Sequence, residues 1–241
     1  MFTAFSLKID DKEMLQLEAG KAQDGTGALE PGRAKEDKLK AEARLRECID
    51  LKHTPNGDFL LKDWFAAEEP RVFLSHSKED EALAYRFADW LYEEFGIATF
   101  LDSFVWEAAD MLVQETGQNA GGRIPVLLNN ELMKLVDHCE CILFMNTQNA
   151  GKDIETRPEL AWIYSEIEAS RLITKKKPKR FKKRNFALTR GTQFELHFDE
   201  QFKNLIPLDV DELIRWHDRY KKISDNVYSL DLLYLHKKFI I

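Results

Sequence analysis

Cysteine is scarce in this chain. Its 241 residues include three cysteines, Cys48, Cys139 and Cys141. An odd and low count provides no disulfide framework and is typical of a reducing compartment. Cys139 and Cys141 flank Glu140 at the start of an apolar run, and two cysteines at that spacing cannot make a metal site alone. We therefore expect them to pack in a core, and we expect no metal.

Positive charge and long apolar runs are also lacking. The formal net charge is -7, which gives no general attraction to nucleic acid. No apolar run approaches the ~20 residues of a membrane span. The first residues, "MFTAFSLKIDDKE", have neither the basic nor the apolar region of a signal peptide. We therefore expect a cytoplasmic protein that does not bind membranes.

A glycine-rich phosphate loop is a third absence. Neither GxxxxGK[ST] nor a GxGxxG after a strand occurs in the sequence. The backbone of such a loop is what brings amide groups close to phosphates in P-loop NTPases and standard dinucleotide folds. Both of these classes are therefore disfavoured.

Strands that alternate with helices begin at Arg71. Residues 72–74 are a short apolar strand, and 80–95 place Ala84, Phe87, Ala88, Leu91 and Phe95 at helical spacing before Gly96. The later segments of the same kind are "IATFLD", "NNELMKLVDHC", "CILFMNT", "TRPELAWIYSEIEASRL", "RNFAL" and "FELHF". This order predicts an α/β fold with a doubly wound, mainly parallel, flavodoxin-like sheet, with Val72–Ser75 at or next to its centre.

Three segments differ in composition. We predict an N-terminal extension over 1–69, partly helical and with a loop rich in glycine and charge, the α/β domain over 70–200, and a C-terminal helical extension over 201–241. The run "KKKPKRFKKR", residues 175–184, carries eight positive residues. Like charges repel and cannot be buried unpaired, so we expect this run to be exposed and dispensable for folding.

Polar residues follow the predicted strands. Ser75, Asp102 and Asn146 each lie at a strand end, where ligands bind in parallel sheets. Ser77 and Asp80 have the spacing of a relaxed capping box, and the polar loop that they share before a helix N-terminus also suits a phosphate. His76 has no identifiable nucleophile or orienting acid, so a serine hydrolase is disfavoured.

A second carboxylate stands at the start of another predicted helix. In "TRPELAW", Thr156 and Glu159 have capping-box spacing, and Pro158 suits the first turn. Glu159 is therefore either a structural cap or a carboxylate that reaches a ligand at the strand ends.

Two stretches resemble a known family. "RVFLSHSKEDEALAYRFADWLYEEFGIATFLD" resembles the first strand, helix and second strand of a bacterial-type TIR (Toll/interleukin receptor) domain. "CILFMNTQNAGKDIETRPELAWIYSEI" resembles its third strand and next helix, where the family reads roughly Ser-x-Trp-Cys-x-x-Glu-Leu. The resemblance covers about 71–200, and the Trp-Cys pair is absent before Glu159.

This resemblance implies a function. Such domains either assemble as signalling scaffolds or cleave NAD at its nicotinamide–ribose bond, and the glutamate essential for cleavage falls on Glu159. NAD would be a substrate rather than a cofactor, in bacterial immune or toxin-like signalling, with self-association and a downstream effector that senses the nucleotide product. The residues implied to line the nucleotide site are Ser75, Ser77, Lys78, Asp102 and Trp106, the last by stacking on a ring.

Two alternatives remain open. A TIR-like adaptor would act by protein–protein assembly without catalysis. An enzyme resembling nucleoside deoxyribosyltransferases would use a similar architecture on another glycosidic bond.

Overall fold

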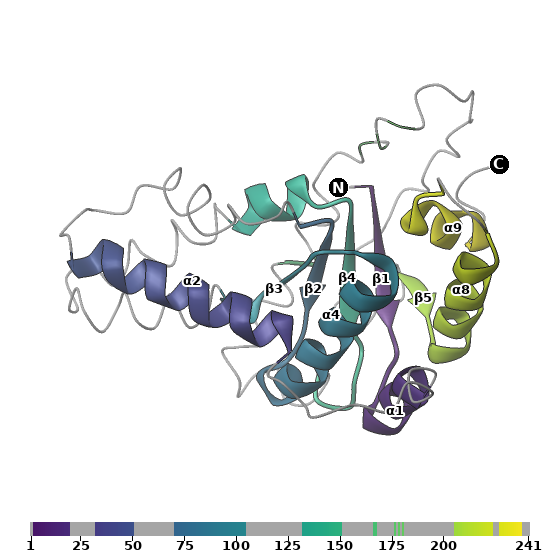
Figure 1. Ribbon diagram of the computed structural model, residues 1–241, viewed down its shortest axis with the longest axis horizontal. Coiled ribbons are helices and arrows are strands. Elements are labelled where there is room, and N and C mark those ends of the chain that lie inside the picture. The colour runs from purple at the N-terminus through teal and green to yellow at the C-terminus, as the bar shows by residue number, and fades with distance from the viewer. Residues whose placement is uncertain are drawn as a thin grey trace, which may run out of the picture.

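A five-stranded parallel sheet is the centre of this protein. The computed structural model describes residues 2–19, 32–50, 70–104, 132–150, 166–167, 176, 178, 180, 205–223 and 227–237. The sheet has the order β3-β2-β4-β1-β5, and all neighbouring strands are parallel (Figure 1). Its strands are β1 Thr3–Leu7, β2 Val72–Ser75, β3 Thr99–Leu101, β4 Cys141–Met145 and β5 Ile206–Leu208. The predicted α/β fold with a parallel sheet is confirmed, and β2 lies next to the central strand.

Helices flank this sheet. They are α1 Asp11–Ala19, α2 Arg33–Asp50, α4 Glu81–Phe95, α8 Val210–Lys222 and α9 Ser229–His236, with a short 3-10 helix, η2, at Lys78–Asp80. Residues 132–138 are also helical. Among the described residues, no helix combines the length and hydropathy of a membrane span. The doubly wound arrangement itself stays a prediction, and the expected strands "RNFAL" and "FELHF" lie outside the described residues.

The sheet extends beyond the range predicted for the α/β domain. β1, from the presumed N-terminal extension, lies between β4 and β5 and pairs with both. β5 comes from the presumed C-terminal extension. Four of its five residues are buried, Phe5 and Leu7 completely, as expected of an interior strand of a parallel sheet. The strand is only five residues long, and nothing in the local sequence shows that it pairs with a strand more than 130 positions away.

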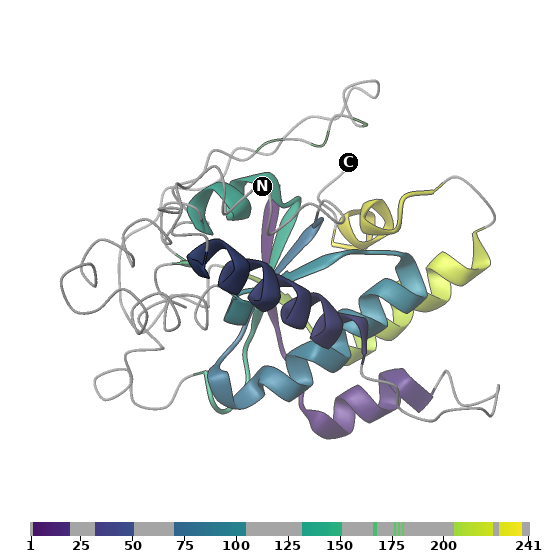
Figure 2. The same ribbon diagram turned by 60° about the vertical axis from the view of Figure 1, so that its left-hand side comes forward.

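Helix α4 covers one face of the sheet, as its sequence predicts. The predicted stripe from Ala84 to Phe95 is buried, and Gly96 ends the helix at φ 64°, where its N–H donates to the Tyr92 carbonyl. Figure 2 shows α1, α4 and α8 on the same side of the sheet. Their core includes the strand residues Phe5, Leu7, Val72, Leu74, Leu101, Leu143 and Met145.

The opposite face carries the alternate residues of the strands. Phe73 and Phe100 pack with ring centroids 5.7 Å apart and do not belong to the α4-side core. Because side chains alternate along a strand, Ser75 and Asp102, two positions further, point to this same face. The polar residues at the strand ends are therefore placed on the side of the sheet away from α4.

An ion cluster lies at the amino-terminal edge of the sheet. Arg180 donates to both carboxylate oxygens of Glu140, which directly precedes β4, and to Asp231 of α9. Its guanidinium also lies 4.0 Å from the Tyr228 ring centroid, and the Tyr234 hydroxyl donates to Glu140. The prediction that the whole basic run is exposed is thus wrong for Arg180, because two acids distant in sequence neutralise it. Lys176 is exposed, as predicted.

Candidate functional site

The candidate site lies where the order of the strands reverses. The chain passes from β2 to β3 on one side and then returns to β4 on the other side of β2. In open parallel sheets, ligands bind beyond the carboxyl ends of the strands at such a switch point. Here Ser75 ends β2, and the residues beyond the strand ends are His76 and Ser77 after β2, Asp102 and Ser103 after β3, and Asn146 and Thr147 after β4.

Asp80 joins the two loops at the switch point. Its carboxylate accepts hydrogen bonds from Ser77 Oγ and Thr147 Oγ1, both at 2.5 Å, and from Asn149 Nδ2 at 2.7 Å. Thr147 Oγ1 in turn accepts from the backbone N–H of Asn149 and of Ala150. Asp80 is buried, so these bonds supply the partners that a buried acid needs. The loops after β2 and β4 are therefore fixed relative to each other.

His76 and Asp102 form a buried pair beside these loops. Asp102 Oδ2 accepts from the His76 backbone N–H at 3.0 Å, and Asp102 Oδ1 lies 3.2 Å from His76 Nε2. The second contact is at ion-pair distance without hydrogen-bond alignment. Nδ1 lies 2.8 Å from the Ser77 carbonyl oxygen, which can only accept, so Nδ1 carries a proton. The ring nitrogen left for chemistry is Nε2.

Glu166 completes the cluster. Its side chain is fully buried, with Ser75 and Asp102 as its polar neighbours. Within the described part of the chain, neither carboxyl oxygen of Glu166 reaches a hydrogen-bond partner with proper geometry, and the same is true of Ser75 Oγ and Asp102 Oδ1. Buried polar atoms normally have partners, so a group of such atoms in one place makes this place the candidate for ligand binding.

Burial and the neighbouring charges shift the pKa values of the two acids in this cluster. Burial raises the pKa of Asp102, against the opposing effects of the His76 charge and hydrogen bonds. Burial also raises the pKa of Glu166 well above its ordinary value, and the negative charge of Asp102 adds to this rise. Two adjacent carboxyls that resist ionisation in the same place are typical of functional sites rather than of structural ion pairs.

The predicted site residues have different surroundings. Ser75 and Asp102 lie together, as the strand-end argument expects. Ser77 is bound to Asp80, and Lys78 is exposed. The capping interpretation of Ser77 is wrong, because its hydroxyl makes no cap bond to the backbone and donates to the Asp80 carboxylate instead. Glu159 and Trp106 lie outside the described residues.

Glu166 is a site residue that the sequence patterns above do not single out. Its signal is Trp162, which precedes Glu166 by four positions, as the tryptophan precedes the glutamate in Trp-Cys-x-x-Glu. Ile163 then stands at the cysteine position. This register places the acid ten residues after Thr156, about three turns into the predicted helix, whereas the capping pattern of "TRPELAW" favours Glu159 at its start.

In the residues that the structure describes, no three His, Cys, Asp or Glu side chains gather in a way that could hold a metal ion. The reactive side-chain groups described at this site are carboxyls, an imidazole and hydroxyls. Comparisons of the chain with protein-family models, curated proteins and solved structures found no match.

Proposed function

We propose that this protein cleaves the bond between nicotinamide and ribose in NAD, with Glu166 as the carboxylate that stabilises the ribosyl cation. The observation that carries the proposal is the buried Glu166 carboxyl beside Ser75 and Asp102 at the carboxyl ends of β2 and β3, whose oxygens make no well-aligned hydrogen bond with the described residues. Such a carboxyl is suited to a partner that arrives with positive charge.

The chemistry needs few groups. Loss of nicotinamide develops positive charge on the ribose, and a fixed carboxylate in a site without water stabilises this charge strongly. Nicotinamide leaves as a neutral ring, so the protein need not donate a proton to it. The ribosyl cation is then captured by water, which gives ADP-ribose, or by a nucleophile of the same molecule, which gives a cyclic product.

Two glutamates compete for this role. Glu159 stays a prediction from the resemblance to TIR domains, and Glu166 is favoured by its contact with Asp102 and by the Trp162 spacing. The decisive measurement is nicotinamide release from NAD by purified wild type, Glu166→Gln and Glu159→Gln. We expect the rate of nicotinamide release to fall at least ~10²-fold in Glu166→Gln, the scale for losing one preorganised electrostatic contact. In Glu159→Gln this rate should stay near that of the wild type.

The exposed residue Glu93 on α4 provides a matched control, because Glu93→Gln removes the same charge far from the strand ends. Full activity of Glu166→Gln would remove this residue from the mechanism. Loss of activity in Glu159→Gln alone would restore the original assignment.

The same preparations separate the alternative functions. Release of a base from neutral nucleosides, with NAD left intact, would favour the deoxyribosyltransferase-like enzyme. Wild-type protein that releases neither, even when concentrated enough to self-associate, would favour the adaptor. An adaptor has no use for a buried acid that lacks a well-aligned partner among the described residues, which is why cleavage is the function proposed here.

A further inference from the structure

His76 is placed to exchange a proton with the carboxyl pair. Its side chain is buried, and its Nδ1–H is committed to the Ser77 carbonyl. Nε2 lies 3.2 Å from Asp102 Oδ1, and Asp102 is in turn the neighbour of Glu166. Asp102 is thus a neighbour of both the imidazole and Glu166, and in this sense the three titratable groups form a row.

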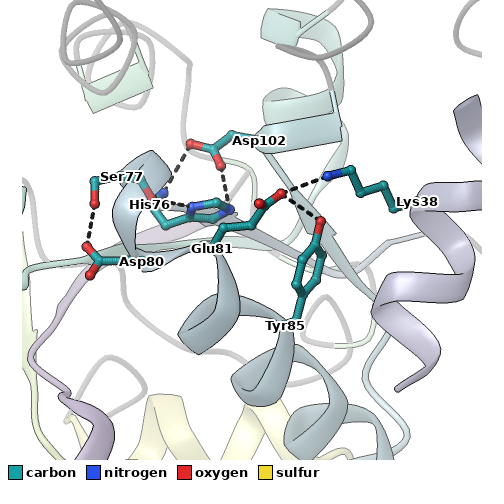
Figure 3. Close-up of polar contacts among 7 residues, drawn as sticks. All are labelled: Lys38, His76, Ser77, Asp80, Glu81, Tyr85 and Asp102. Carbon is teal, nitrogen blue, oxygen red and sulfur yellow. Dashed lines mark hydrogen bonds and ion pairs between the residues drawn. The ribbon is translucent and has the colours of Figure 1, made fainter. Parts of the chain in front are cut away.

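The other two acids near His76, Glu81 and Asp80, have hydrogen-bond partners of their own (Figure 3). Glu81 at the start of α4 accepts hydrogen bonds from Lys38 of α2 and from the Tyr85 hydroxyl, both at 2.8 Å. Burial alone would raise the pKa of Glu81, but these hydrogen bonds and the Lys38 charge bring it below its ordinary value. Asp80, on the other side, accepts from Ser77, Thr147 and Asn149. Glu79 and Lys78 of η2 are exposed.

We propose that His76 is a positioning residue that takes up the proton of Glu166, so that Glu166 carries its negative charge when the cationic substrate is bound. For its catalytic consequence this inference rests on the proposed function. The row of groups itself does not, because it is a property of the protein without substrate.

The proton count stays constant through this exchange. In one arrangement Glu166 is a neutral carboxylic acid, Asp102 is a carboxylate and His76 is neutral with its proton on Nδ1. The O–H bond of Glu166 then breaks, Asp102 relays a proton, and an N–H bond forms at Nε2. The result is an imidazolium between the Asp102 carboxylate and the Ser77 carbonyl, which are the partners that a protonated ring requires.

Two substitutions move the Glu166 charge in opposite directions. His76→Asn keeps a donor for the Ser77 carbonyl but removes Nε2, so Glu166 loses its proton acceptor. Asp102→Asn keeps an oxygen for the His76 backbone N–H but removes the negative charge beside Glu166. We expect the midpoint of Glu166 titration to rise by about 1 pH unit or more in His76→Asn and to fall in Asp102→Asn.

The measurement is a pH titration of the glutamate side-chain carboxyls by 13C NMR, with Glu166→Gln to assign the signal. It needs no substrate. A Glu166 midpoint that stays in place or falls in His76→Asn would overturn the inference, and so would a rise in Asp102→Asn. Each variant provides its own test, so failure of one to fold leaves the other decisive.

Activity provides the second readout. With NAD, kcat of His76→Asn should fall at least ~10-fold at pH 7 and recover as the pH is raised, with KM little changed, since the acid limb of the profile follows Glu166. A purely structural defect would lower kcat equally at every pH. Shifted midpoints without any NAD cleavage in the wild type would remove the proposed function and leave the proton exchange in place.

Discussion

At the amino-terminal edge of the sheet, Glu140 is bound by both Arg180 and the Tyr234 hydroxyl, whereas at the carboxyl-terminal edge Glu166 has no hydrogen-bond partner among the described residues. Both acids are at least nine-tenths buried as side chains. Burial of a charge is costly, and at the amino-terminal edge Arg180 and the Tyr234 hydroxyl offset this cost for Glu140. Under the proposed function, this edge stabilises the fold and the carboxyl-terminal edge binds a ligand.

The largest loss of stability that tests this comparison is expected for a substitution at the amino-terminal edge. Arg180→Ala leaves Glu140 and Asp231 without their shared cation. We expect the free energy of unfolding to fall by about 2–3 kcal/mol, less than for a completely buried pair because Arg180 is partly exposed.

Denaturant unfolding of Arg180→Ala beside Lys176→Ala provides the measurement. Lys176 belongs to the same basic run, but it is exposed and pairs with Asp137 at the surface, so its loss should cost about 1 kcal/mol or less. Equal small effects for the two variants would contradict the structural role of Arg180.

Asp80 sharpens the comparison, because it is a paired acid at the edge where Glu166 is unpaired. Asp80→Asn keeps the size of the side chain but turns one acceptor into a donor that faces donors. We expect a loss of about 1–2 kcal/mol in unfolding free energy, since a buried group is left unsatisfied. A variant as stable as wild type would show that the loops after β2 and β4 do not depend on this carboxylate.

Near pH 5, Glu166→Gln should change the free energy of unfolding less than the other variants do. The difference from wild type should increase as the pH rises. The pKa values of Glu166 and Asp102 are both raised in the folded state, so the folded protein holds protons that the unfolded chain releases. This stability is present below the ordinary pKa of Glu166, 4.5, and is lost as the pH rises toward the folded-state pKa.

Unfolding free energies measured from pH 5 to pH 9 should therefore decline in wild type and decline less in Glu166→Gln, which gains relative stability with rising pH. Glu93→Gln should keep the wild-type slope. Parallel curves for wild type and Glu166→Gln would mean that Glu166 titrates in the folded protein as it does in the unfolded chain.

Much of the fold could be predicted because the signals are local. The spacing from Ala84 to Phe95 and the glycine at 96 define α4, and four consecutive buried residues at 72–75 define a strand near the centre. β1 does not stand out in the sequence, since a strand of five residues is a weak local signal and its partners are far away in sequence. The pairing of Arg180 is hidden for the same reason: its charge is visible in the sequence, but Glu140 and Asp231 are brought to it only by folding.

The residues of the candidate site also differ in how far the sequence could predict them. Ser75 and Asp102 could be placed by the rule that parallel strands bring their carboxyl ends to one edge. Ser77 could not be assigned correctly, because capping and hydrogen bonding to a nearby acid have the same three-residue spacing. Glu166 carried a signal in Trp162, yet its meaning depended on knowing which turn of the predicted helix meets the sheet.

The sequence by itself determined the α/β alternation, the parallel sheet and the presence of polar residues after the buried strands, because hydrophobic periodicity and helix-ending glycine act over a few neighbouring residues. Only the tertiary structure decided that Thr3–Leu7 completes the sheet, that Arg180 is paired, and that His76, Asp102 and Glu166 lie in one row. Each of these depends on burial and on contacts between distant segments, and the protonation of a carboxyl is set by what surrounds it in space.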